Sequence, residues 1–285
     1  MVSRRAIVVS DDAQIKSMLC RILGPQEWTI QDAADNSAAL RLVESSKFDL
    51  ILTSEKTSGK EDVEFLRKIR SIHPHTRVII LTDETTPADV ISAIRERAFS
   101  YFSTPVSLAL LTSIVQHAIE EPCWDDGIEI VSATRDWICL RVRCDMKTAE
   151  RLMQFFHEIT DLPDAEQEVV AMAFRELLMN AIEHGGKFDP EQYVEISYVR
   201  TRRAVALRIK DPGEGFSLEG IPHAAIMNPP DEPLRHLTYR EAEQLRPGGF
   251  GVLLVKSTID ELLYNEKGNE VVLVKYIDQA RSAAS

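Results

Sequence analysis

Short apolar segments alternate with amphipathic segments five times in the first 120 residues of the chain. The apolar segments have the length and the Val, Ile and Leu content of buried strands, and they lie at 6–9, 28–31, 48–53, 78–81 and 98–102. The amphipathic segments have helical spacing, and they lie at 12–22, 37–44, 61–72, 87–97 and 106–119. Five such units predict an α/β domain with a doubly wound, five-stranded parallel sheet, whose sites form at the carboxyl ends of the strands.

The rest of the chain has a different pattern. A stretch rich in charged and turn residues, 121–127, reads as a linker between a first domain at 1–120 and a second at 128–285. The second domain is predicted to be α+β. Its expected strands lie at 128–131, 137–144, 193–198, 204–210 and 270–276, and its expected helices at 147–159, 164–185 and 253–263. Asp164, followed by Gln167, is expected to cap the central helix.

That central helix carries polar residues at a regular spacing. Glu176, Asn180 and His184 are four residues apart, which puts them on one face of a helix. Gly185 and Gly186 are expected to end the helix, because glycine is common just past a helix C-terminus. Taken alone, this helix favours the simpler interpretation of a solvated polar face, with His184 interacting with the helix dipole.

Two glycine motifs follow the helix. Asp211-Pro-Gly-Glu-Gly215 comes directly after a predicted strand, and Pro247-Gly-Gly-Phe-Gly251 opens a predicted helix. A glycine-rich loop at a helix N-terminus can bind phosphate, because its N–H groups are unobstructed and the helix dipole favours anions. Each motif alone is explained by a turn, but the three in this order form a specific signal.

Together the three motifs resemble the GHKL-type ATP-binding fold, in the branch of the anti-sigma-factor serine kinases. The resemblance covers about residues 125–278 and implies a sandwich of a mixed sheet and helices. It implies that Asn180 coordinates Mg²⁺ at the ATP phosphates, and that Glu176 is the general base toward a serine hydroxyl. Asp211 would accept the adenine amino proton, with Gly213 and Gly215 near the base and sugar.

The same resemblance implies that Gly248, Gly249 and Gly251 line the phosphates and that residues 217–246 form a lid over the nucleotide. Arginines of that lid are candidates to reach the phosphates, and ion pairs with lid glutamates are an equal alternative. A histidine-kinase interpretation is disfavoured. His157 lies 180 − 157 = 23 residues before Asn180, too few for a separate helical hairpin.

The first 120 residues resemble the receiver domain of bacterial response regulators, through Val8-Val-Ser-Asp-Asp12, Leu81-Thr82 and Tyr101-Phe-Ser-Thr-Pro105. The switch threonine of that family, Thr82, and the switch aromatic residue, Tyr101, are present. Asp11 and Asp12 follow the first strand. Structural remnants or a helix N-cap are favoured for them over a working metal site.

The chemical positions of the receiver depart from the family pattern. Ser54 stands where the phosphorylated aspartate ends the third strand, Ser10 replaces the first metal-binding acid, and Thr104 replaces the lysine. An acyl phosphate requires a carboxylate, Mg²⁺ requires oxygen ligands of sufficient charge, and a phosphoryl group requires a counterion. We therefore expect a degenerate receiver that is not phosphorylated in the usual way.

Composition limits the remaining functions. A net charge of −12 and a pI near 5.1 argue against nucleic-acid binding, which needs a basic surface. No apolar run approaches the roughly 18 residues that span a membrane, and the four cysteines lack zinc-type spacing, so we expect a cytoplasmic protein.

The expected function is bacterial signalling by a degenerate receiver that regulates an ATP- and Mg²⁺-dependent serine/threonine-kinase-like domain. The resemblance implies, as partner, an anti-sigma antagonist of the STAS type or a sigma factor, and a homodimer is compatible with it. The alternative is a non-catalytic, ATP-gated interaction module or scaffold.

Overall fold

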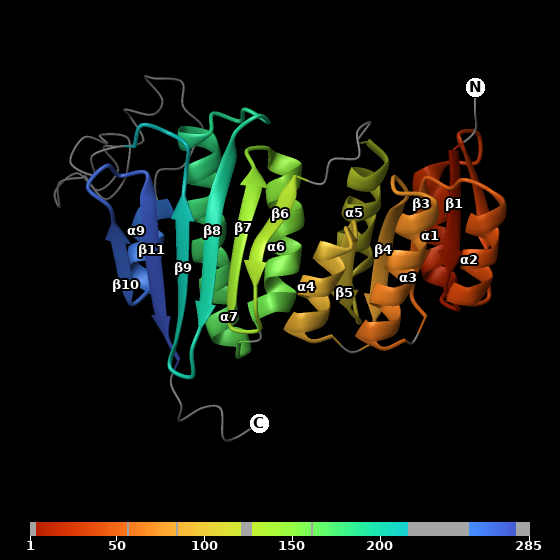
Figure 1. Cartoon of the computed structure of the whole chain (residues 1–285), viewed down its shortest axis with the longest axis horizontal. Coiled ribbons are helices and arrows are strands. Elements are labelled where there is room, and N and C mark those ends of the chain that lie inside the picture. Colours follow the sequence, from red (N-terminus) through yellow and green to blue (C-terminus); the bar gives the residue numbers. More distant parts are fainter. Residues whose placement is uncertain are drawn as a thin grey trace. The chain divides into compact units, whose positions relative to one another are not determined.

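The computed structural model describes residues 4–55, 57–83, 85–120, 127–160, 162–215 and 251–277, with only the backbone of 251–254 (Figure 1). The chain divides into two compact units. Residues 1–126 and 154–160 form the first unit, and residues 127–153 and 161–285 form the second. The domain boundaries expected at residues 120 and 128 remain a prediction.

The first unit contains a parallel sheet whose strands are ordered β2-β1-β3-β4-β5. The strands are β1 (Arg4–Val9), β2 (Trp28–Asp32), β3 (Leu50–Thr53), β4 (Arg77–Thr82) and β5 (Ser100–Ser103). The helices between and after them are α1 (Ala13–Leu23), α2 (Asn36–Ser45), α3 (Gly59–Ile72), α4 (Pro87–Arg95) and α5 (Leu108–Glu120). The predicted doubly wound α/β architecture is confirmed.

Local sequence signals set the helix starts of this unit. The Asp12 carboxylate accepts a hydrogen bond from the Gln14 N–H (2.7 Å) and caps α1. Ser58 and Glu61 form a capping box at the start of α3, and Thr86 forms another at α4. Asp12 is therefore an N-cap, as the sequence favoured.

The second unit is built on a six-stranded sheet in the order β10-β11-β9-β8-β7-β6. Its strands are β6 (Ile128–Ala133), β7 (Trp137–Arg143), β8 (Tyr193–Arg200), β9 (Ala204–Lys210), β10 (Glu261–Tyr264) and β11 (Glu270–Tyr276). Its helical segments are α6 (Met146–Thr160), α7 (Asp164–Asn180), η1 (Ala181–Gly185) and α9 (Gly251–Thr258), and residues 154–160 of α6 are grouped with the first unit.

Helices cover one face of this sheet, and the other face is open (Figure 1). α7 packs against β9, β11 and α9. Buried and partly exposed residues alternate along β9, as expected for a strand with one covered face. The α+β class is confirmed, but we expected a mixed sheet. All the described strand pairs are antiparallel.

Two local expectations were wrong. The helix expected at 253–263 ends at Thr258, and Glu261–Tyr264 is a strand, because its backbone pairs with β11. Asp164 is the first residue of α7 and not its cap. Pro163 occupies the capping position, and no side chain caps that end. A carboxylate in the first turn still interacts favourably with the helix dipole.

Among the helices in the described ranges, none combines the length and the apolar character needed to cross a bilayer.

Candidate functional site

The polar face of α7 presents Glu176 and Asn180, and both residues are half-buried. The helix is held in place from its other side by Val170, Phe174 and Leu178, which are fully buried. In the part of the chain that the structure describes, neither the Glu176 nor the Asn180 side chain makes a hydrogen bond or ion pair. Within the described residues, no protein group therefore occupies their oxygen atoms.

The end of this helix is wider than an α-helix. After Asn180 it continues as the π-helical segment η1, in which the Gly186 N–H donates to the Ala181 carbonyl five residues earlier (2.8 Å). π-Helical turns inside α-helices are frequent at functional sites. The helix ends at Gly185, with Gly186 as its C-cap, as predicted. Gly186 has φ −89°, and the first positive φ after the helix belongs to Lys187.

Gly185 is required by the close approach of Asp211. A Cβ atom added to Gly185 would lie 2.2 Å from Asp211 Oδ1. One added to Gly213 would lie 2.8 Å from the same oxygen and 2.9 Å from Gly185 Cα. Gly186 is similarly close to Cys144, where an added Cβ would lie 2.2 Å from Sγ. The helix end and the first glycine motif therefore meet at the Asp211 carboxylate.

Asp211 follows β9 directly, and its carboxylate is half-buried. The Gly213 N–H donates to Asp211 Oδ1 (2.8 Å). Burial raises the pKa of Asp211, while the Gly213 hydrogen bond and the positive charge of Lys267 lower it. In its ionised form this carboxylate can only accept hydrogen bonds.

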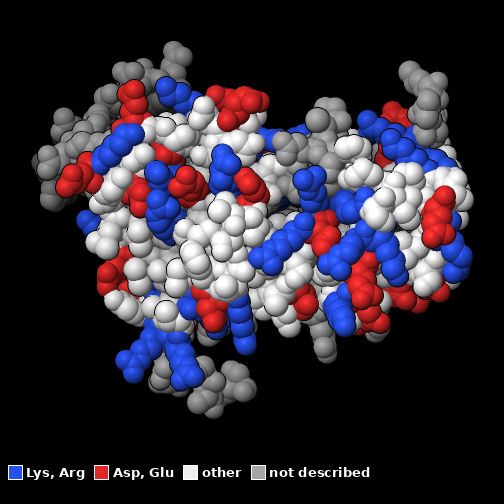
Figure 2. All heavy atoms as spheres, in the orientation of Figure 1, with Lys and Arg blue, Asp and Glu red and all other residues white. Residues whose placement is uncertain are grey.

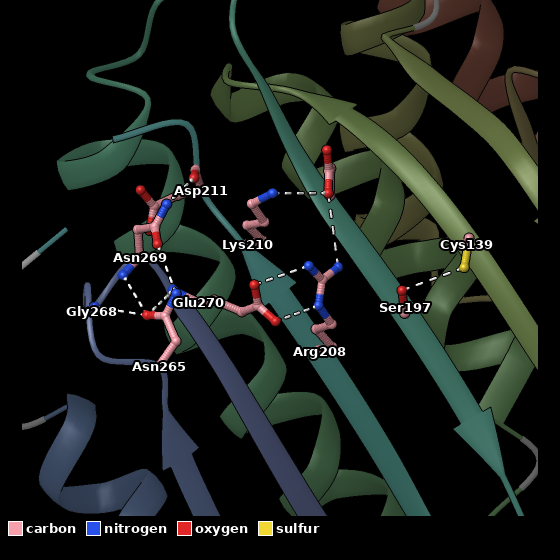
Figure 3. A network of polar contacts seen from close by, with 10 residues as sticks. Cys139, Ser197, Arg208, Lys210, Asp211, Asn265, Gly268, Asn269 and Glu270 are labelled. Atoms are coloured by element: carbon pink, nitrogen blue, oxygen red, sulfur yellow. Dashed lines mark hydrogen bonds and ion pairs between the residues drawn. The ribbon is translucent and has the colours of Figure 1, made fainter. Parts of the chain in front are cut away.

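The turn between β10 and β11 closes the loop from its other side (Figure 3). Gly215 has φ +83°, and a Cβ added to it would lie 1.9 Å from the Lys267 carbonyl oxygen. Asn269 is buried, and its side-chain amide donates to the Asp211 carbonyl (3.2 Å). The sequence did not predict a role for this turn. The turn-forming run Asn265-Glu-Lys-Gly-Asn269 was the available signal, but nothing in it indicates what it contacts.

The remaining predicted residues are placed only in part. Gly251 is the first residue of α9, which packs on α7. Gly248, Gly249 and the predicted lid at 217–246 lie outside the described residues. Within the described ranges, no three His, Cys, Asp or Glu side chains are grouped to hold a metal ion. Asn180 thus remains the protein oxygen to consider for Mg²⁺.

The predicted phosphorylation site of the first unit holds two hydroxyl groups that face each other. Ser54 follows β3 and donates from Oγ to Ser10 Oγ at the end of β1 (2.7 Å). Ser10 Oγ also accepts from the Asp12 N–H (3.1 Å), and Asp11 is exposed. Thr104 Oγ1 donates to Asp83 (2.8 Å). The site thus has a neutral hydroxyl pair at the predicted phosphoacceptor position.

The switch residues of the receiver are tied to a buried acid that the sequence analysis did not single out. Tyr101 is fully buried, and its hydroxyl donates to Asp62 Oδ2 on α3 (3.0 Å). Thr57 also donates to Asp62, and Thr82 Oγ1 donates to the Thr57 carbonyl (3.3 Å). Burial raises the pKa of Asp62. Hydrogen bonds therefore hold Tyr101 in the interior.

These two units correspond to two known domain families. Residues 6–116 match the family model of the response regulator receiver domain, and residues 142–275 match that of the histidine kinase-like ATPase domain. The chain therefore consists of a response regulator receiver domain followed by a histidine kinase-like ATPase domain of the GHKL type.

Individual relatives match one domain each or little more. The serine-protein kinase RsbW of Listeria monocytogenes is 27% identical over 113 residues, which cover 39% of this chain and 67% of RsbW. The transcriptional regulatory protein GlrR of Escherichia coli (strain K12) is 24% identical over 138 residues, which cover 48% of this chain and 31% of GlrR. The chain thus spans about a third of the length of that regulator.

Among solved structures, a response regulator receiver domain protein from Methanospirillum hungatei JF-1 is 25% identical, with a TM-score of 0.35. The match covers 41% of this chain and 95% of the chain of that protein.

Proposed function

We propose that this protein is a signalling protein in which a receiver without phosphoacceptor chemistry regulates an ATP-dependent protein serine/threonine kinase. The observation that carries the proposal is the meeting of Gly185, Asp211 and Gly213 at the end of the helix that bears Glu176 and Asn180. Residues from two distant motifs thereby meet around one half-buried hydrogen-bond acceptor, Asp211. This is what recognition of a base amino group requires.

The side chains support distinct roles in that site. Asp211 accepts the adenine amino proton, and Gly213 leaves room for the base beside it. The half-buried amide oxygen of Asn180 has no protein partner among the described residues, which suits one ligand of Mg²⁺ whose other ligands are phosphate oxygens and water. Bound there, the ion would neutralise phosphate charge. Glu176, one helical turn before Asn180, takes the proton of the attacking hydroxyl.

The likeness to RsbW, a serine-protein kinase, supports serine as the acceptor. The substrate would be a small anti-sigma antagonist of the STAS type, and a sigma factor would be the protein held in its absence. The protein would act in the cytoplasm, as a monomer or a homodimer.

The receiver would act as a docking surface and not as a phosphorylated switch. The Ser10–Ser54 hydroxyl pair supports this, because a serine hydroxyl cannot form the acyl phosphate of a receiver aspartate. Deleting residues 1–120 should weaken partner binding or change the kinase rate. Equal binding and rate in the shortened protein would refute this role.

ATP binding is the first test. Calorimetry should detect Mg²⁺-dependent binding of ATP to the full chain, and Asn180→Ala should lose the Mg²⁺-dependent part. If the wild-type protein does not bind ATP, the nucleotide site is a structural remnant.

The second candidate is an ATP-gated interaction module without phosphoryl transfer. Among the described residues, no hydrogen bond orients the Glu176 side chain, and this favours the interaction module. Glu176→Gln separates the two functions. A kinase should lose phosphorylation and keep ATP binding, whereas an interaction module should show no phosphorylation in either form.

A further inference from the structure

The turn that joins β10 to β11 touches the loop that carries Asp211, although it is far from that loop in sequence. The Asp211 N–H donates to the Asn269 carbonyl (2.9 Å), and Asn269 Nδ2 donates back to the Asp211 carbonyl (3.2 Å). The same amide lies 3.5 Å from the Gly213 carbonyl. Both ends of the Asp211–Gly213 segment are therefore held by one buried side chain (Figure 3).

Asn269 is itself fixed in orientation by Asn265. Asn265 Nδ2 donates to Asn269 Oδ1 (3.0 Å). Asn265 Oδ1 accepts from the N–H groups of Gly268 (2.7 Å) and Asn269 (3.1 Å), which closes the turn. Because its oxygen already has a donor, the Asn269 side chain must point its NH₂ group at the Asp211 loop. A buried amide with every partner in place is a rigid support.

Lys267 contributes a charge from the tip of the same turn. Its Nζ donates to the Gly213 carbonyl (3.0 Å), and its own carbonyl is the group that leaves no room for a side chain at position 215. The other titratable groups that face Asp211 are His184 from η1 and Cys144 after β7. Lys267 is the permanent cation among these three.

We propose that the Asn265–Asn269 turn is a positioning element of the nucleotide site, in which Asn269 fixes the Asp211–Gly213 backbone and Lys267, whose ammonium donates to the Gly213 carbonyl, places a positive charge beside the Asp211 loop. This inference rests on the proposed ATP binding and adds residues that the glycine motifs do not contain. Neither residue touches the reacting atoms, and both act through Asp211.

The test of Asn269 is the dissociation constant for Mg·ATP, measured by calorimetry on the full chain. Asn269→Ala removes a buried hydrogen-bond donor and leaves the groups that it binds without a partner. We therefore expect the Kd to rise about tenfold. An unchanged Kd in a folded variant would overturn the role of Asn269. If this variant does not fold, Lys267 still tests the inference, because its side chain is exposed and can be replaced without disturbing the core.

The test of Lys267 is a pH profile, which a purely structural role would not move. Asp211 must be ionised to accept the adenine amino proton, and the Lys267 charge favours the ionised form. For Lys267→Met, the loss of ATP affinity on acidification should therefore begin at a higher pH than in the wild type. Taking the ratio of the two Kd values at each pH cancels the titration of ATP itself.

Lys210→Met is the matched control. Lys210 precedes Asp211, but its ammonium lies on the open face of the sheet, 3.8 Å from Glu195 (Figure 3). The pH profile of ATP affinity in Lys210→Met should follow that of the wild type. The inference would be overturned if the ratio of the Lys267→Met Kd to the wild-type Kd stayed constant with pH. It would also be overturned if the pH profile of Lys210→Met shifted by the same amount as that of Lys267→Met. Wild-type protein that binds no ATP at any pH would instead refute the proposed function and the inference with it.

Discussion

Replacing Gly185 by alanine tests whether the helix that bears Asn180 must touch Asp211. The added Cβ would lie 2.2 Å from Oδ1 and 2.3 Å from Cγ of Asp211. Non-bonded atoms of this kind settle at about 3.5 Å, so the carboxylate or the helix end must move by roughly 1 Å. Asp211 would no longer meet the adenine amino group in its present position.

The size of the effect follows from the cost of overpacking. Such insertions cost about 1–3 kcal/mol. If the whole cost falls on the binding conformation, the Kd for ATP rises roughly 5- to 150-fold. Alanine is favoured over glycine in a helix by about 1 kcal/mol, which offsets part of the loss in overall stability. The free energy of ATP binding should therefore weaken by more than the free energy of unfolding does.

Calorimetry with Mg·ATP and urea unfolding measure these two quantities. Gly186→Ala is the matched control, because its added Cβ meets Cys144 Sγ at the same distance of 2.2 Å and not Asp211. We expect the control to lose stability and to keep most of its ATP affinity. Wild-type affinity in Gly185→Ala, or an equal loss in both variants, would refute the reasoning.

Three further predictions concern backbone strain and the receiver. Gly215→Ala should destabilise its unit in urea by more than Gly24→Ala destabilises the other. Both glycines have positive φ, which costs about 1–2 kcal/mol for alanine, but only Gly215 also meets a backbone atom; similar losses would contradict this. The pKa of Asp62 is raised, so the stability it contributes is present in acid and is lost as the pH rises through that pKa. Asp62→Asn, which keeps an acceptor for Tyr101, should flatten the pH dependence of receiver unfolding, and an unchanged slope would argue against the assignment. Acetyl phosphate should add no phosphate to the receiver in a mass spectrum, because Ser54 offers no carboxylate, and a gain of one phosphate would show that another residue accepts it.

Much of the fold could be predicted because its signals are local. β9 and β11 have the bounds that alternation predicted, 204–210 and 270–276. Each has one buried face, so its period of two is visible in the sequence. In the receiver, the strands β3 and β4 are buried on both faces, and their apolar residues stand out as short runs in the sequence.

The errors lie where tertiary contacts decide. Residues 261–264 are apolar enough for a helix or a strand, and only pairing with β11 makes them a strand. Asn269 lies 58 residues from Asp211 in sequence, so a turn motif could not reveal that contact. The two glycines after α7 end the helix, as their position predicted, but their close packing against Asp211 and Cys144 could not be read from the sequence.

The Ser10–Ser54 hydrogen bond also changes what the receiver needs in order to stay folded. A cluster of carboxylates at the end of a parallel sheet repels itself and depends on a bound cation for relief. Two hydroxyl groups 2.7 Å apart satisfy each other instead. Chelators and changes in magnesium concentration should therefore leave the melting temperature of this unit unaltered. The fold of the receiver is then independent of the magnesium concentration, as the proposed role as a docking surface requires.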